Sequence, residues 1–417
     1  MAKPIMVITL IVLMASAASA QGVWTAMTSP VTTNLNDVSL LPDGSAWAVG
    51  QTGTVLRFDG STWTAEETPI TEDLNAVFGL SGTEVWTVGN SGAIYAYDGS
   101  DWTRAEGIDP NYSFYDLALD PTGTLWVCGS EFLSGGIVMR LMPAGDWELF
   151  ASRPTGLRKM DIPRAGEIWA VGGGDMVHHY ARNSWQSLTT GTGDTLFAVQ
   201  AAVDGTVWVT GSRFSDGRQH IFRYTGADWE KTHEDWGEWL LDIQMLDEHQ
   251  GFVVGQEGKV MRWDGEAWTN TGPVGTRTLN ALDMTSAYYG IAVGDRGTIF
   301  QFSQPSIDVN TSKAMFQAGD TFELTLVLGN PGPVQNVDLY VILDVYSSYF
   351  FFPNWTPDVG FENRTLVPDS ETEETLLEFV WPTGAGAADG IVFYAAILDA
   401  GTMNFATDFD FAAFGFR

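Results

Sequence analysis

The 417-residue sequence contains a single cysteine, Cys128, in the stretch LWVCG. An intramolecular disulfide is therefore impossible, and stability has to come from packing. Cys128 takes a position that valine holds in the related segments described below, which indicates a small buried apolar residue and not a reactive thiol. The sequence has no HExxH motif, no cysteine pair and no D-x-D-x-D-G loop, so we expect no metal site and no cofactor.

Basic residues are also scarce, with 20 lysines and arginines against 52 acids and a net charge of −32. Such a chain is repelled by nucleic-acid phosphates and by anionic membrane surfaces, so we expect no nucleic-acid partner and consider cationic ligands favoured.

Long apolar runs are missing after the first twenty residues. Lys3, the apolar run 5–14 and the A-x-A pattern at 18–20 predict a secretory signal peptide over residues 1–20. We expect the mature chain to begin at Gln21, to be secreted or held at the cell surface (periplasmic or extracellular), and to have no membrane insertion after signal cleavage.

A glycine-ended phrase recurs seven times. The closing glycines are about 40 residues apart and stand at Gly50, Gly89, Gly129, Gly172, Gly211, Gly255 and Gly294. Three residues before each glycine is a large apolar residue, usually tryptophan, and a second tryptophan follows in the first six copies. Each copy separates short alternating runs by turn residues, as in LNDVSLL, AWAVG, TVLRF and TWTAEE, which predicts four antiparallel strands.

Seven such units predict an all-β fold, a seven-bladed β-propeller over residues 21–302. Twelve of the 17 tryptophans fall at the two recurring positions, where large flat side chains can fill the space between blades. The seventh copy lacks its second tryptophan, and Trp24 stands as far before Leu35 as Trp63 does before Leu74. We therefore expect the N-terminal strand to complete the seventh blade and close the ring.

These phrases resemble the repeats of secreted bacterial propellers in the BNR and Ycf48-like (photosystem-assembly-factor) group, which share LN-V, W-VG--G-I and DG--W cores. The resemblance covers Trp24 to about Phe302. It implies the propeller fold and suggests an assembly-factor role. The stretch from Asp59 to Trp63 is one residue shorter than a sialidase Asp-box (Asp-x-Gly-x-Thr-Trp), so sialidase catalysis is not implied.

After Phe302 the repeat stops. Residues 303–310 are expected to form a linker, and residues 311–417 an immunoglobulin-like β-sandwich, because alternating and apolar runs are separated there by glycine, proline and asparagine. This part resembles C-terminal modules of secreted bacterial repeat proteins.

No catalytic residue can be nominated from the sequence. His178 and His179 are neighbours on an expected strand and point to opposite faces, which argues against a shared metal ion. A paired-carboxylate enzyme stays possible because carboxylates are numerous, but no spacing singles out a pair. One basic position recurs too regularly for a specific site, so we favour a structural role over an anion-binding ring at Arg57, Arg140, Arg223 and Arg262.

The candidate ligand-binding residues are those that break the symmetry of the repeat, on the face where loops between strands two and three and between blades meet. Residues opening the first strands predict a mixed polar and aromatic channel mouth: Asn36, Asn75, Tyr115, Arg158, Phe197 and Asn280. Two lengthened loops and the nearby HEDWGEWL add a second set: Phe132, Phe214, Arg218, Trp236 and Trp239. The alternative is that long loops merely tolerate insertions.

The main hypothesis is a secreted, non-catalytic propeller scaffold that binds an extracellular protein, peptide or glycan. One alternative is a glycan-active hydrolase or lyase that uses carboxylates at the channel mouth. The other is an assembly factor for a secreted or envelope protein.

Overall fold

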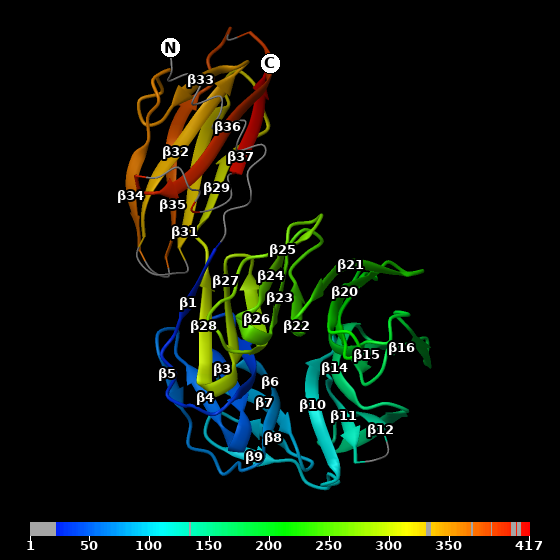
Figure 1. Ribbon diagram of the computed structural model, residues 1–417. Coiled ribbons are helices and arrows are strands. Elements are labelled where there is room, and N and C mark those ends of the chain that lie inside the picture. Colours follow the sequence, from blue (N-terminus) through cyan, green and yellow to red (C-terminus); the bar gives the residue numbers. More distant parts are fainter. Residues whose placement is uncertain are drawn as a thin grey trace. The chain divides into compact units, whose positions relative to one another are not determined.

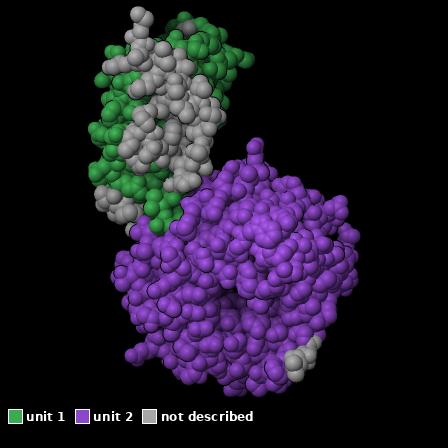
Figure 2. Space-filling view, in the orientation of Figure 1, with its two compact units in different colours: residues 1–24, 302–417 green, residues 25–301 purple. Residues whose placement is uncertain are grey.

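The computed structural model describes residues 22–132, 135–330, 335–367, 370–384, 386–401, 406 and 410–417 (Figure 1). The expected signal peptide lies outside the described residues. The chain forms two compact units, which Figure 2 colours separately. We call Thr25–Gln301 the repeat unit and Phe302–Arg417 the C-terminal unit, with which the described residues up to Trp24 are grouped. Within the described ranges, no helix is long and apolar enough to cross a membrane.

The described part of residues 23–303 forms seven four-stranded sheets, numbered here in chain order. Sheet 1 contains β2 (Leu35–Leu40), β3 (Ala46–Gly50), β4 (Val55–Phe58) and β5 (Trp63–Ala65). Sheet 2 contains β6 (Leu74–Ser81), β7 (Glu84–Gly89), β8 (Ile94–Tyr97) and β9 (Trp102–Arg104). Sheet 3 contains β10 (Tyr112–Leu119), β11 (Leu125–Glu131), β12 (Gly135–Leu141) and β13 (Trp147–Arg153). Sheet 4 contains β14 (Leu157–Arg164), β15 (Glu167–Gly172), β16 (Val177–Ala181) and β17 (Ser184–Leu188).

The remaining sheets follow the same order. Sheet 5 contains β18 (Thr195–Ala201), β19 (Val207–Arg213), β20 (Arg218–Tyr224) and β21 (Trp229–Trp236). Sheet 6 contains β22 (Leu240–Met245), β23 (Gly251–Gly255), β24 (Val260–Trp263) and β25 (Trp268–Asn270). Sheet 7 contains β26 (Leu279–Ser286), β27 (Tyr289–Gly294), β28 (Thr298–Ser303) and, from the other end of the described chain, β1 (Val23–Ala26). Short 3-10 turns are η1 (Gln51–Gly53), η2 (Gln256–Gly258) and η3 (Asp295–Gly297).

The recurring glycine has a steric cause. At Gly50 a Cβ would lie 2.0 Å from the carbonyl oxygen of Asn34, just before the first strand of the same sheet. The backbone of Gly50 is extended, with φ −166°, so the close approach and not the dihedral angle requires glycine. Five of the other copies repeat this contact with a backbone carbonyl. The exception is Gly211, whose Cβ would meet side-chain atoms of Leu196 and Asp194.

The recurring aromatic residues pack between neighbouring sheets. Trp47 of sheet 1 lies 5.2 Å from Tyr97 and 5.9 Å from Trp102 of sheet 2, measured between ring centroids. Trp208 of sheet 5 meets Trp263 of sheet 6 at 5.0 Å in the same way. Such contacts bury large apolar surfaces that a single sheet would leave exposed. The recurring tryptophans therefore hold neighbouring sheets together by apolar packing.

The recurring arginines lie over aromatic rings. Guanidinium carbons stand 5.4 to 5.8 Å from the ring centroids in the pairs Arg57–Trp47, Arg140–Trp126, Arg223–Trp208 and Arg262–Phe252. In the fourth sheet His179 replaces the arginine and stacks on Trp169 at 3.7 Å. These cation–π contacts give the recurring basic position a structural role.

The first strands of the seven sheets contact one another in sequence. β2 contacts β6, β6 contacts β10, and so on to β26, which contacts β2 and closes the series. Aspartate side chains fix these contacts: Asp37 Oδ2 accepts the N–H of Val77 at 2.8 Å, and Asp283 Oδ2 accepts that of Leu40 at 2.7 Å. The second bond joins the last sheet to the first.

The C-terminal unit contains two sheets around one core. The first has the order β29 (Ser306–Thr311), β31 (Thr321–Asn330) and β35 (Ser370–Val380). The second has the order β30 (Met315–Phe316), β37 (Asp410–Phe416), β36 (Ala388–Asp399), β32 (Gln335–Val345) and β33 (Ser348–Phe351), with β34 (Glu362–Leu366) on β32. Alternate residues of β31 enter the core, where Phe322 packs with Phe316, Phe393 and Phe414.

The expected linker differs from the structure. Residues 306–311 belong to β29, which pairs with β31 from Ser306 opposite Gly329 to Thr311 opposite Leu324. The physical reason is alternation: Ile307 and Val309 are buried in the core of the C-terminal unit while their neighbours are more exposed.

We predict that Gly50→Ala lowers the free energy of unfolding by about 3 kcal/mol, because the new Cβ would overlap a backbone carbonyl that cannot rotate away. Gly211→Ala is the matched control, since its Cβ would meet side-chain atoms of Leu196 and Asp194 and no backbone carbonyl. Urea denaturation of both variants measures the difference. Equal losses at the two positions would contradict the steric explanation.

Candidate functional site

Each first strand contains a bulge, and the bulged residue is the one that breaks the repeat symmetry. The pairing with the second strand skips one residue in every sheet, for example between Leu35 and Asp37 and between Leu157 and Lys159. The skipped residues include every predicted channel-mouth position: Asn36, Asn75, Tyr115, Arg158, Phe197 and Asn280. A bulge frees a residue from the ladder and re-aims its side chain, which suits variable contacts at one end of the sheets.

The three bulged asparagines connect neighbouring sheets. Each donates a side-chain N–H to a backbone carbonyl of the next sheet in the series. Asn36 reaches Leu74 at 2.7 Å, and Asn75 reaches Phe114 at 2.7 Å. Asn280 reaches Leu35 at 2.8 Å. Each asparagine thus uses a side-chain donor to join two neighbouring sheets, which gives it a structural role.

Four of the predicted residues form one continuous group. The ring of Trp239 stacks on Phe197 at 5.4 Å and meets Phe214 edge-on at 4.8 Å. The guanidinium of Arg158 lies 5.6 Å from the centroid of Phe197. Phe197 is buried, Trp239 is half-buried and Phe214 is 62% exposed, so the group runs from the interior to the surface.

A second aromatic–basic pair lies beside this group. Arg218 stands 4.7 Å over the ring of Trp236, which is 60% exposed. The N–H of Gly237 bonds to the carbonyl of Gly217, which ties the segment after Trp236 to the turn that carries Phe214. We call Phe197, Phe214, Trp236 and Trp239, with Arg158 and Arg218, the aromatic patch.

The lengthened loop in the fifth copy is largely an extension of the strands. β19 and β20 stay paired beyond Gly211 as far as Arg213 opposite Arg218, and β21 continues to Trp236. Three strands thus extend past the end of the standard sheet, and only residues 214–217 form a turn. The extension gives the exposed aromatic residues a rigid base, as a flexible loop would not.

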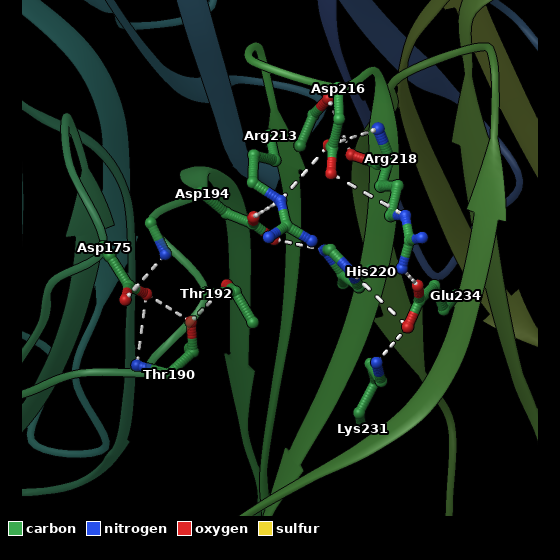
Figure 3. A network of polar contacts seen from close by, with 12 residues as sticks. Asp175, Thr190, Thr192, Asp194, Arg213, Asp216, Arg218, His220, Lys231 and Glu234 are labelled. Carbon is green, nitrogen blue, oxygen red and sulfur yellow. Dashed lines mark hydrogen bonds and ion pairs between the residues drawn. The ribbon is translucent and has the colours of Figure 1, made fainter.

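A network of charged side chains supports this extension (Figure 3). Asp194 and His220 are fully buried, with Oδ2 and Nδ1 2.5 Å apart. Figure 3 shows Arg213 and Arg218 reaching Asp216 in the turn from either side, and Arg213 Nε lies 3.2 Å from Asp216 Oδ1. Glu234 pairs with Arg218. The network joins β19, β20 and β21 to the segment before β18.

A cavity of about 340 Å³ borders the patch. Its lining includes Glu238, Glu257 and Lys259, and Gln256 Oε1 accepts the N–H of Trp239 at 3.2 Å. Lys259 is 6% exposed and lies 3.4 Å from Asp235 Oδ2 and 3.7 Å from Glu238 Oε2. The surroundings of the patch therefore carry more carboxylates than free cations.

Besides the three asparagines, two predicted residues do not join the patch. Tyr115 is half-buried on β10. Phe132, in the turn after β11, is 74% exposed. It belongs to the corresponding turn of sheet 3, where the second and third strands are also extended beyond the repeat glycine.

Sequence reasoning missed a charged cluster on the first strands. Lys159 Nζ lies 3.5 Å from Asp116 Oδ1 and 3.9 Å from both Asp37 Oδ1 and Asp242 Oδ1. The four side chains come from sheets 4, 3, 1 and 6, so they meet across the ring of first strands. All four stand thirteen residues before a repeat glycine, where the other three copies have Ala76, Ala198 and Ala281. Comparing that one position across the copies would have found them.

The charges in this cluster are coupled. Burial raises the pKa of Asp37 to about 7 and that of Asp116 to about 6, although Lys159 opposes both shifts. Burial also disfavours the charged form of Lys159, but the carboxylates of Asp116, Asp242 and Asp37 outweigh it and hold the Lys159 pKa well above its usual value. Lys159 is thus the counter-charge that keeps three carboxylates together.

No group of three or more histidine, cysteine, aspartate or glutamate side chains placed to hold a metal ion occurs among the residues that the structure describes. His178 instead contacts Ser187 Oγ at 2.9 Å, and burial lowers the pKa of His178 to about 4.

We predict that Lys159→Met costs about 3 kcal/mol of stability at about pH 8, because three buried carboxylates lose their counter-charge. The folded-state pKa values of Asp37 and Asp116 are raised, so protonation on going from about pH 8 to about pH 5 favours the folded state and should reduce the loss. Urea denaturation at both pH values measures this, with Lys159→Arg as the charge-preserving control. A loss that is the same at both pH values would contradict the assignment.

No protein-family model and no curated protein matches the chain. Solved structures match it by fold. Ycf48 bound to D1 peptide superposes with a TM-score of 0.55 and 18% identity over 69% of this chain and 98% of that chain. Ycf48 from Cyanidioschyzon merolae gives 0.54 and 18%, over 69% and 99%. PorZ, a surface component of the type-IX secretion system of Porphyromonas gingivalis, gives 0.52 and 13%, over 92% and 59%. At these identities the likeness shows the fold alone: the four-stranded sheets match β-propellers such as Ycf48 and PorZ.

Proposed function

We propose that the chain is a seven-bladed β-propeller closed by its N-terminal strand and followed by an immunoglobulin-like β-sandwich. The closed series of contacts among the first strands supports the blade count, and the pairing of β1 with β28 supports the closure. The two sheets of the C-terminal unit share one apolar core, which supports the sandwich. The proposed boundaries are 21–302 for the propeller and the rest of the chain for the sandwich. The connection between them is shorter than expected, because β29 already begins at Ser306.

The proposed function is that of a secreted, non-catalytic scaffold that binds an extended segment of a partner protein at the aromatic patch. The observation that carries this proposal is the exposure of Phe214 and Trp236 on a rigid three-stranded extension. Solvent-exposed aromatic residues held in fixed positions are typical of recognition surfaces, since they bury much area at little entropic cost.

The charges around the patch favour a basic partner. Arg218 is paired with Glu234 and stacked on Trp236, so its charge is already satisfied. The carboxylates of Asp235 and Glu238 lie close to the patch in sequence and share one cation, Lys259, as their ion-pair partner. The net charge of −32 would add long-range attraction for a cationic segment. A peptide with apolar or aromatic side chains between lysines or arginines fits these conditions.

Two further points support binding over other roles. Ycf48 is a propeller seen with a peptide bound, and PorZ is a surface component of a secretion system. The signal-peptide pattern of residues 1–20 favours a location outside the cytoplasm, where such a partner would also have to be. The alternatives are a glycan ligand and a role as assembly factor. The array experiment below distinguishes a glycan ligand from a peptide ligand.

The test is to probe peptide and glycan arrays with the mature chain, residues 21–417. We expect basic peptides with aromatic or apolar residues to bind. In the double variant Phe214→Ala/Trp236→Ala, the affinity should fall by at least about thirtyfold, because the exposed anchors are lost.

Phe132→Ala is the matched control, because Phe132 is an even more exposed aromatic residue in the corresponding turn of another sheet. Its affinity should equal that of the parent. Peptide binding that survives the double variant would place the site elsewhere. Glycan binding without peptide binding, or turnover of a chromogenic glycoside, would replace the proposal by a glycan-directed function.

A further inference from the structure

A second cavity lies between sheets 5 and 6, at the other end of the same strands. Its volume is about 530 Å³, which is within the range of small-molecule sites. The lining comes from the turn between β18 and β19, the end of β20 and the segment after β22. The cavity is thus separate from the patch, which lies where β18 and β22 begin.

The cavity lies where sheet 5 carries a smaller residue than sheet 1 at the same turn position. Nine residues before its repeat glycine, sheet 1 has Leu41, which is 2% exposed and packs between sheets 1 and 2. Sheet 5 has Ala202 at the same position. Both residues start the same turn, since the N–H of Leu41 bonds to Ser45 O and that of Ala202 to Thr206 O. Replacing leucine by alanine in a conserved turn geometry leaves unfilled space.

The interior of the cavity is aromatic and apolar. Trp208 and Arg223 lie on one side, with the guanidinium carbon 5.6 Å from the indole centroid. Met245 and Leu246 provide the facing wall. The charge of Arg223 is offset by Glu230, whose Oε2 accepts from Nη2 at 2.7 Å and from Nε at 3.2 Å. The interior therefore offers no free positive charge to an anion.

The rim carries an excess of negative charge. It contains Asp204, Asp247 and Glu248. One cation is close to the rim: Arg164 donates from Nη2 to the carbonyl of Val203, and its Nη1 lies 3.6 Å from Glu167 Oε2. Asp204 and Asp247 each accept one backbone N–H of their own turn, and neither has a lysine or arginine within ion-pair distance among the described residues. In the part of the chain that the structure describes, the ion-pair partner of the Glu248 carboxylate is the exposed His249, at 3.3 Å.

We propose that this cavity binds a small organic cation: a primary ammonium or guanidinium group on an apolar or aromatic stem. The stem would fill the space left by Ala202 against Trp208, and the cation would lie among the rim carboxylates. A cation near an aromatic face and opposite unpaired carboxylates is attracted by both. An anionic ligand is disfavoured by the rim, and a neutral one gains only the apolar contact.

The experiment compares three probes of one shape: 2-phenylethylamine, 2-phenylethanol and 3-phenylpropanoate. Titration calorimetry and ligand-observed NMR with the mature chain should show the amine binding at least about tenfold more tightly than the alcohol, and the carboxylate not binding. Added salt should weaken amine binding, since the rim is exposed.

Two variants locate the site. Ala202→Leu fills the cavity with the side chain that sheet 1 already accommodates, and should abolish binding of the amine and the alcohol alike. The rim variant Asp204→Asn/Asp247→Asn/Glu248→Gln should lower the amine to the affinity of the alcohol. Asp43→Asn is the control for general surface charge, because Asp43 caps the corresponding turn in sheet 1, where Ser45 N bonds to its Oδ1 at 3.0 Å.

Thermal unfolding of each variant confirms that it is folded. The rim residues are exposed, so the rim variant should stay folded and can test the proposal even if Ala202→Leu is unstable. The proposal is overturned if the amine fails to bind at about 10 mM, if the alcohol binds as tightly, or if amine binding is unchanged in the rim variant or reduced equally by Asp43→Asn.

Discussion

The architecture of the repeat unit depends on hydrogen bonds from backbone amides of one first strand to side-chain carboxylates of its neighbour. Five aspartates make this bond. Four of them accept an amide that lies 40 to 44 residues later in the chain: Asp37, Asp116, Asp161 and Asp242. Asp283 accepts the N–H of Leu40 and so joins the last sheet to the first. Apolar packing between sheets is strong but non-directional. A carboxylate that accepts a specific N–H fixes the offset between two sheets, and the aromatic contacts then form at defined distances.

Burying these aspartates between the first strands disfavours their charged form, and Lys159 offsets that cost. Burial alone would drive Asp37 and Asp116 towards the neutral form, yet each also needs an oxygen free to accept an amide. A single lysine, Lys159, contributed by one sheet, serves three sheets at once. Alanine at the same position of the other copies leaves the room that this side chain needs. One asymmetric residue thus stabilises an otherwise regular ring.

The fifth sheet departs from the repeat at both ends, whereas sheet 3 shares only the extension of its second and third strands. At one end its strands extend and carry Phe214 and Trp236; at the other, Ala202 leaves a cavity beside Trp208. Neither change disturbs the aromatic contacts or first-strand bonds in between. Local variation on a fixed frame is how repeat folds acquire specific surfaces without losing stability.

The sequence predicted what repeats, and much less of what varies. The glycine and the two aromatic positions recur over seven copies, so a strand or turn that is ambiguous in one copy can be assigned from the others. The four-strand pattern and the pairing of the Trp24 segment with the last copy could therefore be predicted. Arg158, Phe197, Phe214 and Trp239 were proposed as ligand-binding because they break a regular pattern, and the structure places them in contact with one another. Asn36, Asn75 and Asn280 occupy the same variable position, but their side chains bond to the next sheet. The sequence pattern alone does not distinguish a residue that joins two sheets from one that contributes to the aromatic patch. Lys159 escaped notice because its partners lie far away in sequence.

The bond between Arg296 N and Asn34 Oδ1 spans 262 residues, and β1 pairs with β28. On a chain synthesised from its N-terminus, β1 is made before all the other strands of the repeat unit, and its partner β28 is made after them. While the intervening sheets are being synthesised, β1 has an open hydrogen-bonding edge that its own partner cannot yet cover. The strand is only four residues long and is followed by a largely polar segment, which limits its pairing with a neighbouring chain during that time.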